Sequence, residues 1–319
     1  GLAVSRWAGD GCAVPAVRGG RVDQGDDGEF DPMTLARPSF RPDPNRTRDE
    51  MVALQRDLAA VATFGDDHDC TPASVAVDGA ASLTSGLPEP ESDAGGPSDP
   101  VVVGVDQAFC TDRDDEPDTA VAAAVAMRGG RVIEYASAVT PVAIPYVPGL
   151  LSFREGEPIL AALESLAVAP DLLVCDGSGR IHYRQAGLAT HVGVTVGCPA
   201  VGVAKRLLCG TPEESVDERP AGWRTPIRAD DSVEPVGDAD DERAEPPVIG
   251  YAYQSRQYPN SKRVNPLYVS PGHRVSAAAA VDLVAALCAG YKLPEPTRLA
   301  DAHADRVKRQ QEERQHEER

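Results

Sequence analysis

Lysine, paired cysteines and long apolar runs are scarce or absent in this chain. Of its 31 basic residues only 4 are lysine, whereas 27 are arginine. Its 7 cysteines form no Cys-x-x-Cys pair, which argues against a structural zinc site and a disulfide framework. No apolar stretch reaches the roughly 18 residues that span a membrane, and no secretory signal pattern opens the chain. We therefore expect a cytoplasmic protein that does not bind a membrane.

Acidic residues are concentrated in two segments of the chain, whose formal net charge is −19. Residues 64–100 carry 8 acidic and no basic side chains, and residues 213–245 carry 12 acidic and 4 basic ones, so together they contribute −16. The stretch 101–212 contributes only −4, and 246–319 contributes +3. The acidity therefore belongs mostly to a linker and an insertion, and the rest of the chain need not repel phosphate groups.

The abundance of Asp and Glu with so little lysine indicates adaptation to salt. At molar salt the Debye length shrinks to about 3 Å, so an acidic surface no longer repels itself strongly. We favour a halophilic source on this ground. An acidic interaction surface is the alternative that the composition leaves open.

The 319 residues suffice for one large domain or two small ones with a buried core. The spacing of Met51, Leu54, Leu58 and Val61 predicts a helix. From the N-terminus onward we expect a disordered or non-native extension (1–44), this N-terminal helix (45–63), an acidic linker with no core pattern (64–100), a main domain (101–302) that contains the acidic insertion (213–247), and a charged tail that is solvated helix or disorder (303–319).

The main domain combines strand and helix patterns. Gly129-Gly130 between two apolar runs indicates a tight hairpin, so the domain should start with three antiparallel strands. Gly290 is placed as the C′ glycine of the last apolar helix. The expected strands are 101–109, 119–127, 132–140, 171–176, about 193–203, 248–254 and 264–270, and the expected helices are 153–168 and 276–289. This order predicts an α/β domain with a mixed β-sheet flanked by helices.

Three carboxylates stand where a carboxylate is unusual. Asp106 ends the apolar run 101–105, Asp176 ends the apolar run 172–175, and Glu155 lies at the start of a helix. A buried strand rarely carries an ionised group unless a metal or partner compensates for desolvation. The three oxygen ligands therefore suggest a site for Mg²⁺, with Mn²⁺ as a possible substitute.

Each carboxylate also has a structural alternative. Ser152-x-x-Glu155 matches a capping box, in which the glutamate bonds the backbone at the helix start. Asp176 precedes Gly177, and aspartate before glycine is a common turn pair. Asp106 has no turn residue after it, which makes a purely structural role there less expected.

Four further residues lie in settings that suit contact with a nucleic acid. Tyr146 lies between Pro145 and Pro148, and such a stiff loop could insert its ring into a base stack, although a core tyrosine is the default for an isolated aromatic. Lys205 and the following arginine lie at a strand end, where they could hold a phosphate or form an ordinary solvated pair. His273, in a strand-to-helix turn, could orient a water or contact a phosphate, or be incidental.

Six runs of the sequence together closely resemble endonuclease V. They are, in that family's order, 104–106, the PYVPGLLSFRE run at 145–155, 176–179, 202–205, 272–276 and 290–298. The resemblance covers about 101–212 and 248–302, and the run at 145–155 is the most specific part of it. The helix at 45–63 resembles the family's N-terminal helix more weakly.

The resemblance implies a ribonuclease H-like fold and a Mg²⁺-dependent cut in DNA near deaminated bases, chiefly inosine. The cut would fall at the second phosphodiester bond 3′ of the lesion and leave 3′-hydroxyl and 5′-phosphate ends. By this resemblance Asp106, Glu155 and Asp176 match the metal-binding carboxylates, His273 and Lys205 match groups near the scissile phosphate, and Tyr146 matches the wedge that replaces the flipped base. The remaining positions that match its DNA-contacting or base-pocket residues are Arg154, Gly149, Leu151, Gly177, His182, Gly187, Leu188 and Leu208. Two departures are Ser178, where the family often has His or Gln, and Tyr183, which replaces the usual proline after His182.

Other functions remain open at this point. The same fold could serve a ribonuclease specific for inosine-containing RNA, or a nucleic-acid-binding module that does not cut. A metal-dependent phosphatase of small nucleotides would leave the stiff Tyr146 loop unexplained. In each nucleic-acid case we expect the protein to act as a monomer.

Overall fold

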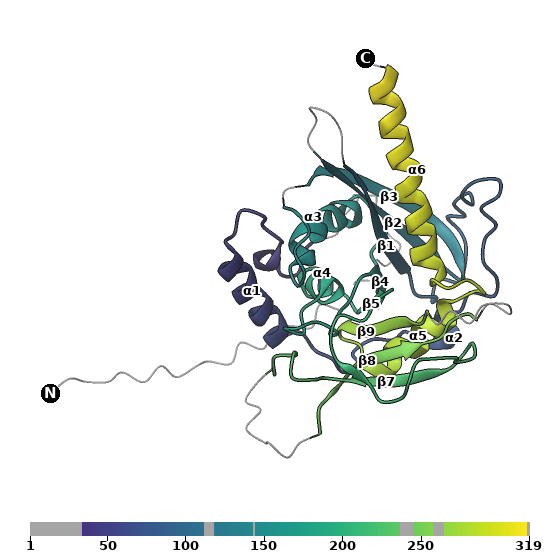
Figure 1. The fold of residues 1–319 in the computed structure, drawn as a ribbon. Coiled ribbons are helices and arrows are strands. Elements are labelled where there is room, and N and C mark those ends of the chain that lie inside the picture. Colours follow the sequence, from purple (N-terminus) through teal and green to yellow (C-terminus); the bar gives the residue numbers. More distant parts are fainter. Residues whose placement is uncertain (1–33, 112–117, 143, 237–244, 258–264, 318–319) are drawn as a thin grey trace.

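The computed structural model describes residues 34–111, 118–142, 144–236, 245–257 and 265–317. Within these residues a single nine-stranded sheet runs through the molecule in the order β3-β2-β1-β4-β5-β9-β8-β7-β6 (Figure 1). It is mixed, because β1, β4 and β5 are parallel and their other neighbours are antiparallel. The predicted α/β class with a mixed sheet flanked by helices is confirmed.

The bounds of the elements follow the chain. The strands are β1 (Val102–Cys110), β2 (Thr119–Arg128), β3 (Arg131–Pro141), β4 (Leu172–Asp176), β5 (Ala200–Ala204), β6 (Thr211–Pro212), β7 (Arg224–Arg228), β8 (Val248–Tyr253) and β9 (Leu267–His273). The helices are a 3-10 turn η1 (Pro38–Phe40), α1 (Arg48–Val61), α2 (Pro72–Val75), α3 (Leu151–Glu164), α4 (Leu188–Val196), α5 (Ala277–Leu287) and α6 (Glu295–Glu317).

The three antiparallel strands that open the main domain are present as predicted. β1 pairs with β2 along its whole length, and β2 pairs with β3 across the Gly129-Gly130 turn. β1 also pairs in parallel with β4, which aligns Val105 with Cys175. The residue after each of these partners is an aspartate, so β4 ends at Asp176 beside Asp106, which lies in the middle of β1.

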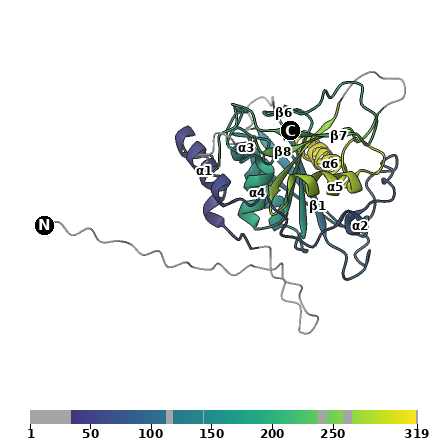
Figure 2. The same cartoon turned by 90° about the horizontal axis from the view of Figure 1, so that it is seen from below.

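Side chains alternate between the two faces of the sheet, and a different helical layer covers each face. Val102, Val174 and Val203 pack in one core with α5 and the start of α6. Val103 and Leu173 pack in a second core with α3 and α4. Figure 2 shows these two helical layers on opposite sides of β1. The alternation fixes which face each site residue projects from.

Helix α6 crosses the sheet at close range. A Cβ atom on Gly104 would lie 2.2 Å from the carbonyl carbon of Pro296, so β1 needs glycine where the helix passes. Further along α6 the ring of His303 lies 5.0 Å from that of Tyr135 on β3. The described part of the tail predicted at 303–319, up to Glu317, is therefore a continuation of α6, and its first residues pack on the sheet.

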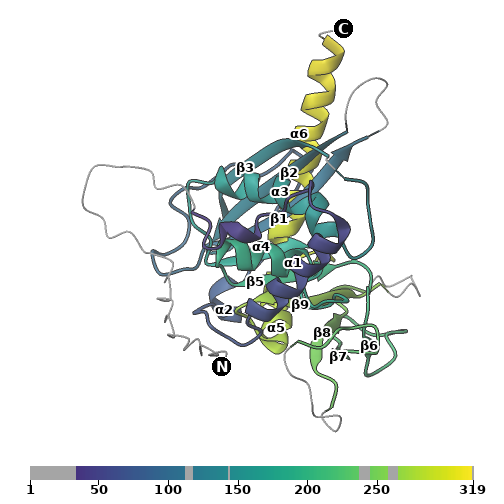
Figure 3. The same cartoon turned by 90° about the vertical axis from the view of Figure 1, so that its left-hand side faces the viewer.

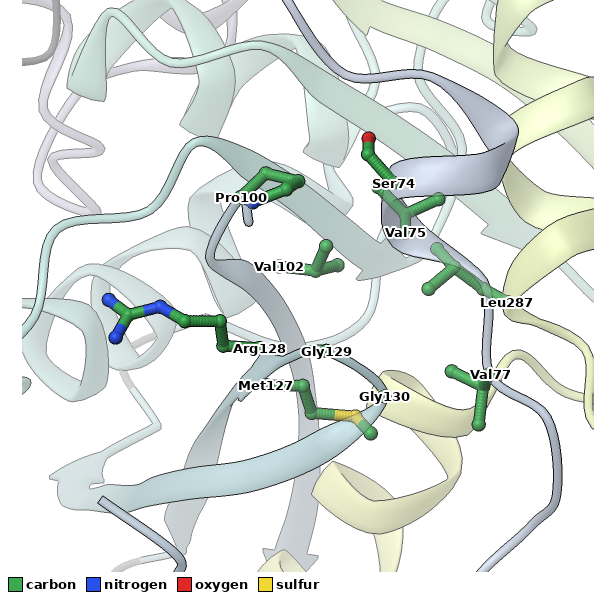
Figure 4. Close-up of a pocket in the computed structure, with 10 residues that line it drawn as sticks. All are labelled: Ser74, Val75, Val77, Pro100, Val102, Met127, Arg128, Gly129, Gly130 and Leu287. Atoms are coloured by element: carbon green, nitrogen blue, oxygen red, sulfur yellow. The ribbon is translucent and has the colours of Figure 1, made fainter. Parts of the chain in front are cut away.

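The acidic segment 64–100 is not a linker without a core pattern, as the sequence suggested. Cys70, Val75 and Val77 are buried in the core that α5 shares with the sheet. A small pocket between α2, Leu287 and the Gly129-Gly130 turn shows this packing (Figure 4). It lies at the end of the sheet where β1 begins, away from the carboxylates. Apolar residues are sparse in this segment, so its few anchors produce no recognisable periodicity.

The segment also caps α5 through Asp66, whose carboxylate accepts hydrogen bonds from the backbone and hydroxyl of Ser276. The described part of the expected extension 1–44 likewise packs on the domain. The carbonyl of Phe40 lies 2.6 Å from Nε2 of His191, and Arg41 pairs with Glu157 and Glu164 on α3. Residues 1–33 lie outside the described residues.

Three further differences from the sequence analysis concern helix and strand bounds. Helix α4 occupies Leu188–Val196, so the strand expected at about 193–203 begins only at Ala200. Strands β6 and β7 lie at and within the acidic insertion and were not predicted. Helix α5 ends at Leu287 with Cys288 as its C-cap, so Gly290 lies beyond the C′ position.

The N-terminal helix was predicted in the correct place, but it is shorter than the expected 45–63 and spans Arg48–Val61. Thr47 caps it, and Glu50 completes a capping box with the Thr47 backbone. Figure 3 shows α1 lying across α4 on the outer side of that layer. Among the described residues, no helix combines the length and apolar character that a membrane crossing needs.

Candidate active site

Two aspartates and a lysine project from one face of the sheet where the parallel pairing of β1, β4 and β5 ends. Asp106 lies in alternation with Val102 and Asp176 with Val174, so both point toward the face that α6 covers. Lys205 follows β5 on the same face, and its Nζ lies 2.6 Å from Oδ2 of Asp176. We call this region, where the parallel pairing of β1, β4 and β5 ends, the acidic edge.

Asp106 is the most deeply buried of these groups, with 6% of its surface exposed. Its Oδ1 accepts a hydrogen bond of 2.7 Å from the Gln107 backbone, whereas Oδ2 is buried and has no partner among the described residues. Burial raises the pKa of Asp106 well above its ordinary value, and the neighbouring Asp176 raises it further. A buried oxygen of this kind is costly unless something positive binds it.

Asp301 on α6 is the site residue that the sequence analysis missed. Its charge raises the pKa of Asp106 and that of Lys205, so this exposed carboxylate lies near the acidic edge. Pro296, five residues before Asp301, touches Gly104, two residues before Asp106, so the start of α6 lies close to the acidic edge. The run 290–298 marked the start of this helix, but nothing in the sequence gave its phase relative to β1.

Glu155 reaches the acidic edge from the opposite layer. It lies in the first turns of α3, and its Oε2 accepts a hydrogen bond from Nε2 of Gln107, whose alternation turns it toward that layer. Burial raises the pKa of Glu155 to about 8; Arg154 and Gln107 oppose the shift, and Asp176 adds to it. Gln107 thus joins Asp106 and Glu155, a link that the sequence analysis also missed.

The capping-box alternative for Glu155 is wrong. Helix α3 begins at Leu151 with Leu150 as its N-cap, and no side chain caps it. The Ser152 hydroxyl lies inside the helix, buried and without a partner among the described residues. Glu155 is therefore not engaged in a cap.

The donor set of the acidic edge fits Mg²⁺, which prefers carboxylate oxygens. Asp106, Asp176, Glu155 and Asp301 bring four carboxylates to it, and Lys205 is the cation paired with Asp176 there. As the described side chains stand, no three of His, Cys, Asp or Glu converge closely enough to enclose a metal ion. The unpartnered Oδ2 of Asp106 is the observation that fits a bound cation best.

The structure does not bring His273 to the acidic edge. β9 runs antiparallel to β5, so His273 pairs with Ala200 while Asp176 pairs with Val203, ~10 Å further along the strand. The ring is buried, and its Nδ1 accepts a hydrogen bond of 3.2 Å from the Thr63 backbone. Burial, with Arg37 and Arg274 nearby, lowers its pKa to about 4.

Tyr146 lies in the loop that leads into α3, and 61% of its surface is exposed. A tyrosine so exposed is not the core residue that was the default alternative. Arg154, at the start of α3, stacks over the ring of Phe109 at 4.4 Å from its centre. Both residues thus lie on segments that flank the acidic edge.

The other residues matched to the base pocket lie on three segments. Gly177 follows β4, and Gly187 and Leu188 begin α4 beside it, since a Cβ on Gly177 would lie 2.9 Å from Leu188. Leu151 opens α3, and Leu208 packs beyond β5 in a small core with Ile181. The loop bearing Gly149 is joined to His182, whose ring is buried and whose Nε2 lies 3.1 Å from the Gly149 carbonyl.

This geometry defines the structural class of the protein. Two aspartates where the pairing of adjacent parallel strands ends, joined by a carboxylate from a helix on each face, describe an α/β protein of the ribonuclease H-like class, with an acidic edge suited to phosphodiester chemistry.

Comparison with known proteins gives the family. The family model of endonuclease V matches residues 90–302. An endonuclease V of Halobacterium salinarum is 57% identical over 275 residues, which are 85% of this chain and 98% of that protein. The chain therefore belongs to the endonuclease V family, a family of nucleases.

Solved structures agree with this assignment. The endonuclease V of Streptomyces avermitilis has a TM-score of 0.57 and 34% identity, and the match covers 86% of this chain and 97% of that one. The endonuclease V of Ciona intestinalis, in complex with a 24-mer DNA containing an inosine followed by a ribo-adenosine, shares the fold with a TM-score of 0.56 and 20% identity, over 82% of this chain and 97% of that one.

Proposed function

We propose that this nuclease is a Mg²⁺-dependent repair enzyme that recognises deaminated bases in DNA, chiefly inosine. It cuts the second phosphodiester bond 3′ of the lesion and leaves 3′-hydroxyl and 5′-phosphate ends. The observation that carries the proposal is the acidic edge, where Asp106 holds a buried, unpartnered oxygen beside Asp176. The inosine-containing DNA bound by the Ciona protein supports the choice of lesion.

Asp106 and Asp176 would hold the metal ion, with Glu155 beside them. When bound, the ion supplies positive charge that polarises the phosphate and acidifies a water. Glu155, with a pKa of about 8 in the metal-free protein, can take up or release a proton near neutral pH, which suits a group that orients the attacking water. Lys205 offsets the negative charge of Asp176, and its ammonium group would bind a phosphate oxygen.

Lesion recognition is assigned to the Tyr146 loop and the segments beside it. Flipping a base out of the stack costs a few kcal/mol, and least for a weakly paired base such as inosine. The exposed ring of Tyr146 is free to fill the gap that the base leaves. Backbone groups at Gly149, Gly177 and Gly187 are proposed to line the pocket for the flipped base.

The proposal is tested with four oligonucleotides of one sequence: a DNA duplex and an RNA strand, each with and without one inosine. We expect cleavage of the inosine DNA at one position only, dependent on Mg²⁺, with end groups identified by their response to phosphatase and ligase. Cleavage confined to inosine RNA would replace the DNA function by a ribonuclease function. Binding without cleavage would indicate a recognition module.

We also propose that the enzyme works in a salt-rich cytoplasm. The chain carries 50 acidic against 31 basic side chains, and the basic residues are almost all arginine. Phosphate contacts weaken as salt rises, so at high salt affinity must come largely from stacking and from the base pocket.

A further inference from the structure

The carbonyl of Gly149 is held by three separate donors. Nε2 of Gln55 lies 2.9 Å from it, Nη2 of Arg184 lies 3.0 Å from it, and Nε2 of His182 lies 3.1 Å from it. A carbonyl oxygen has two lone pairs, so it has no capacity left for a further donor. Gly149 lies three residues after Tyr146, and the segment that contains both residues leads directly into α3.

These donors also fix one another. Oε1 of Gln55 accepts a hydrogen bond of 2.7 Å from Nε of Arg184. Nδ1 of His182 accepts from the Arg184 backbone at 3.1 Å, so the proton of the neutral ring is on Nε2, where it is donated to Gly149. Burial, with Arg184 nearby, lowers the pKa of His182 to about 4, which keeps the ring neutral near pH 7.

Gly149 is suited to this arrangement by its backbone and by its lack of a side chain. Its φ of +78° is a conformation that other residues rarely adopt, and a Cβ there would lie 3.2 Å from the Arg184 guanidinium. The peptide is thus turned toward its three donors and cannot easily rotate.

The acidic insertion, through Glu234, forms hydrogen bonds with both the loop that carries Arg184 and the N-terminal helix. The Glu234 backbone donates to the carbonyl of Tyr183 at 2.7 Å and accepts from Nε2 of Gln185 at 2.8 Å. The Glu234 carboxylate accepts from Nε of Arg56, the neighbour of Gln55 on α1, at 2.8 Å. One continuous set of hydrogen bonds therefore joins four segments: the N-terminal helix, the loop after Tyr146, the loop 182–185 and the insertion. We call this set of contacts the bracket.

We propose that Gln55 and Arg184 are positioning residues for lesion recognition: they lock the Gly149 carbonyl and thereby hold the Tyr146 loop in place before DNA arrives. This inference rests on the proposed function. It also gives the acidic insertion a task, because Glu234 braces the loop that carries Arg184. Neither positioning residue touches the acidic edge, so they act on recognition and leave the chemistry unchanged.

The test compares Gln55→Leu with Thr47→Ala in the full chain. Leucine fills similar space at a position with no exposed surface but removes both polar contacts. Thr47→Ala removes the cap of the same helix and destabilises it without touching the bracket. We expect Gln55→Leu to raise KM for the inosine duplex about tenfold while kcat changes less than about threefold. Thr47→Ala should lower the melting temperature yet leave KM unchanged.

Coupling to Tyr146 separates positioning from general stability. If Gln55 acts through the loop, Gln55→Leu should add little to the KM of Tyr146→Ala, because the ring that it positions is already gone. Fully additive effects would overturn the inference. Arg184→Met, at a half-buried position, is the second variant if Gln55→Leu does not fold, and an unchanged KM in a folded variant would also overturn it.

The outcome distinguishes this inference from the function on which it rests. A wild-type protein that cleaves inosine DNA and Tyr146→Ala with a raised KM leave the function standing, whatever Gln55 does. A wild-type protein with no preference for inosine over undamaged DNA or RNA would overturn the function, and the positioning role with it.

Discussion

Replacing Glu155 by glutamine should stabilise the metal-free protein at alkaline pH while it removes activity. The carboxyl has a pKa of about 8 in the folded protein against an ordinary value of 4.5, mainly because it is buried. The folded state therefore binds more protons than the unfolded state between these two values, and stability falls as pH rises through that window. Glutamine has nothing to ionise, and its Oε1 can still accept the hydrogen bond from Gln107.

The magnitude follows from the two pKa values. At 1.36 kcal/mol for each pH unit, the wild-type carboxylate costs at most ~5 kcal/mol above pH 8. Relaxation and water entry reduce such penalties, so we expect the variant to be more stable by about 2–4 kcal/mol near pH 9 and by less than about 1 kcal/mol near pH 5. In melting temperature this gap corresponds to roughly 4–10 °C.

The assay is thermal or urea unfolding of both proteins in chelator, near pH 5 and near pH 9, and again with Mg²⁺. Bound metal favours the ionised carboxylate, so Mg²⁺ should narrow the gap at alkaline pH. Parallel pH dependences of the two proteins in chelator would refute the reasoning, since they would show that Glu155 titrates alike in the folded and unfolded states.

Three further outcomes are expected. Asp106→Asn or Asp176→Asn should abolish cleavage but preserve binding to inosine DNA in a gel-shift titration; near wild-type turnover in Mg²⁺ would show that the acidic edge is not the site. Tyr146→Ala should weaken binding to the inosine duplex about ten- to a hundredfold and Tyr146→Phe much less, because stacking contributes about 1–3 kcal/mol; equal affinities of wild type and the alanine variant would reduce the tyrosine to a loop residue. The melting temperature should rise between about 0.1 M and about 2 M KCl as acidic repulsion is screened, and a flat or falling curve would contradict the salt adaptation.

Acid should also destabilise the protein in a definite window. Burial lowers the pKa of His182 and His191 to about 4, so each ring stays neutral in the folded state and must be protonated on unfolding below pH 6.5. Each histidine thus contributes up to ~3 kcal/mol that is lost as pH falls from about 6.5 to about 4. Urea unfolding over this range checks the slope. His191→Gln should flatten it, and an unchanged slope would show that the ring takes no part.

The sequence predicted the parts of the site that carry a local signal. Asp106 and Asp176 each end an apolar run, which predicted that both belong to one oxygen-ligand site, although the parallel pairing of β1 with β4 that brings them together was not predicted. Two prolines indicated a stiff loop that could present the ring of Tyr146, and its exposure agrees with this alternative over a core tyrosine. Such features can be predicted because they depend on residues that are close together in the sequence.

The predictions that were wrong or missing concerned features that depend on how elements distant in the sequence are oriented relative to one another. His273 was placed by resemblance near the phosphate, but the antiparallel direction of β9 carries it to the other end of the sheet. Asp301 went unnoticed because its position depends on how α6 crosses β1 at Gly104. The strand expected at about 193–203 failed because a short apolar run suits a buried helix and a buried strand equally.

The passage of α6 over Gly104 has a consequence for the order in which the site is made. Asp301 leaves the ribosome 195 residues after Asp106, a delay of roughly 10–40 s at ordinary rates of synthesis. Until then a nascent chain has its first strands and its exposed tyrosine, but not the helix that brings the fourth carboxylate to the edge. A growing chain that meets nucleic acid near the ribosome would thus encounter it before this helix is in place. We expect a chain stopped before α6 to lack cleavage activity even if its strands have paired.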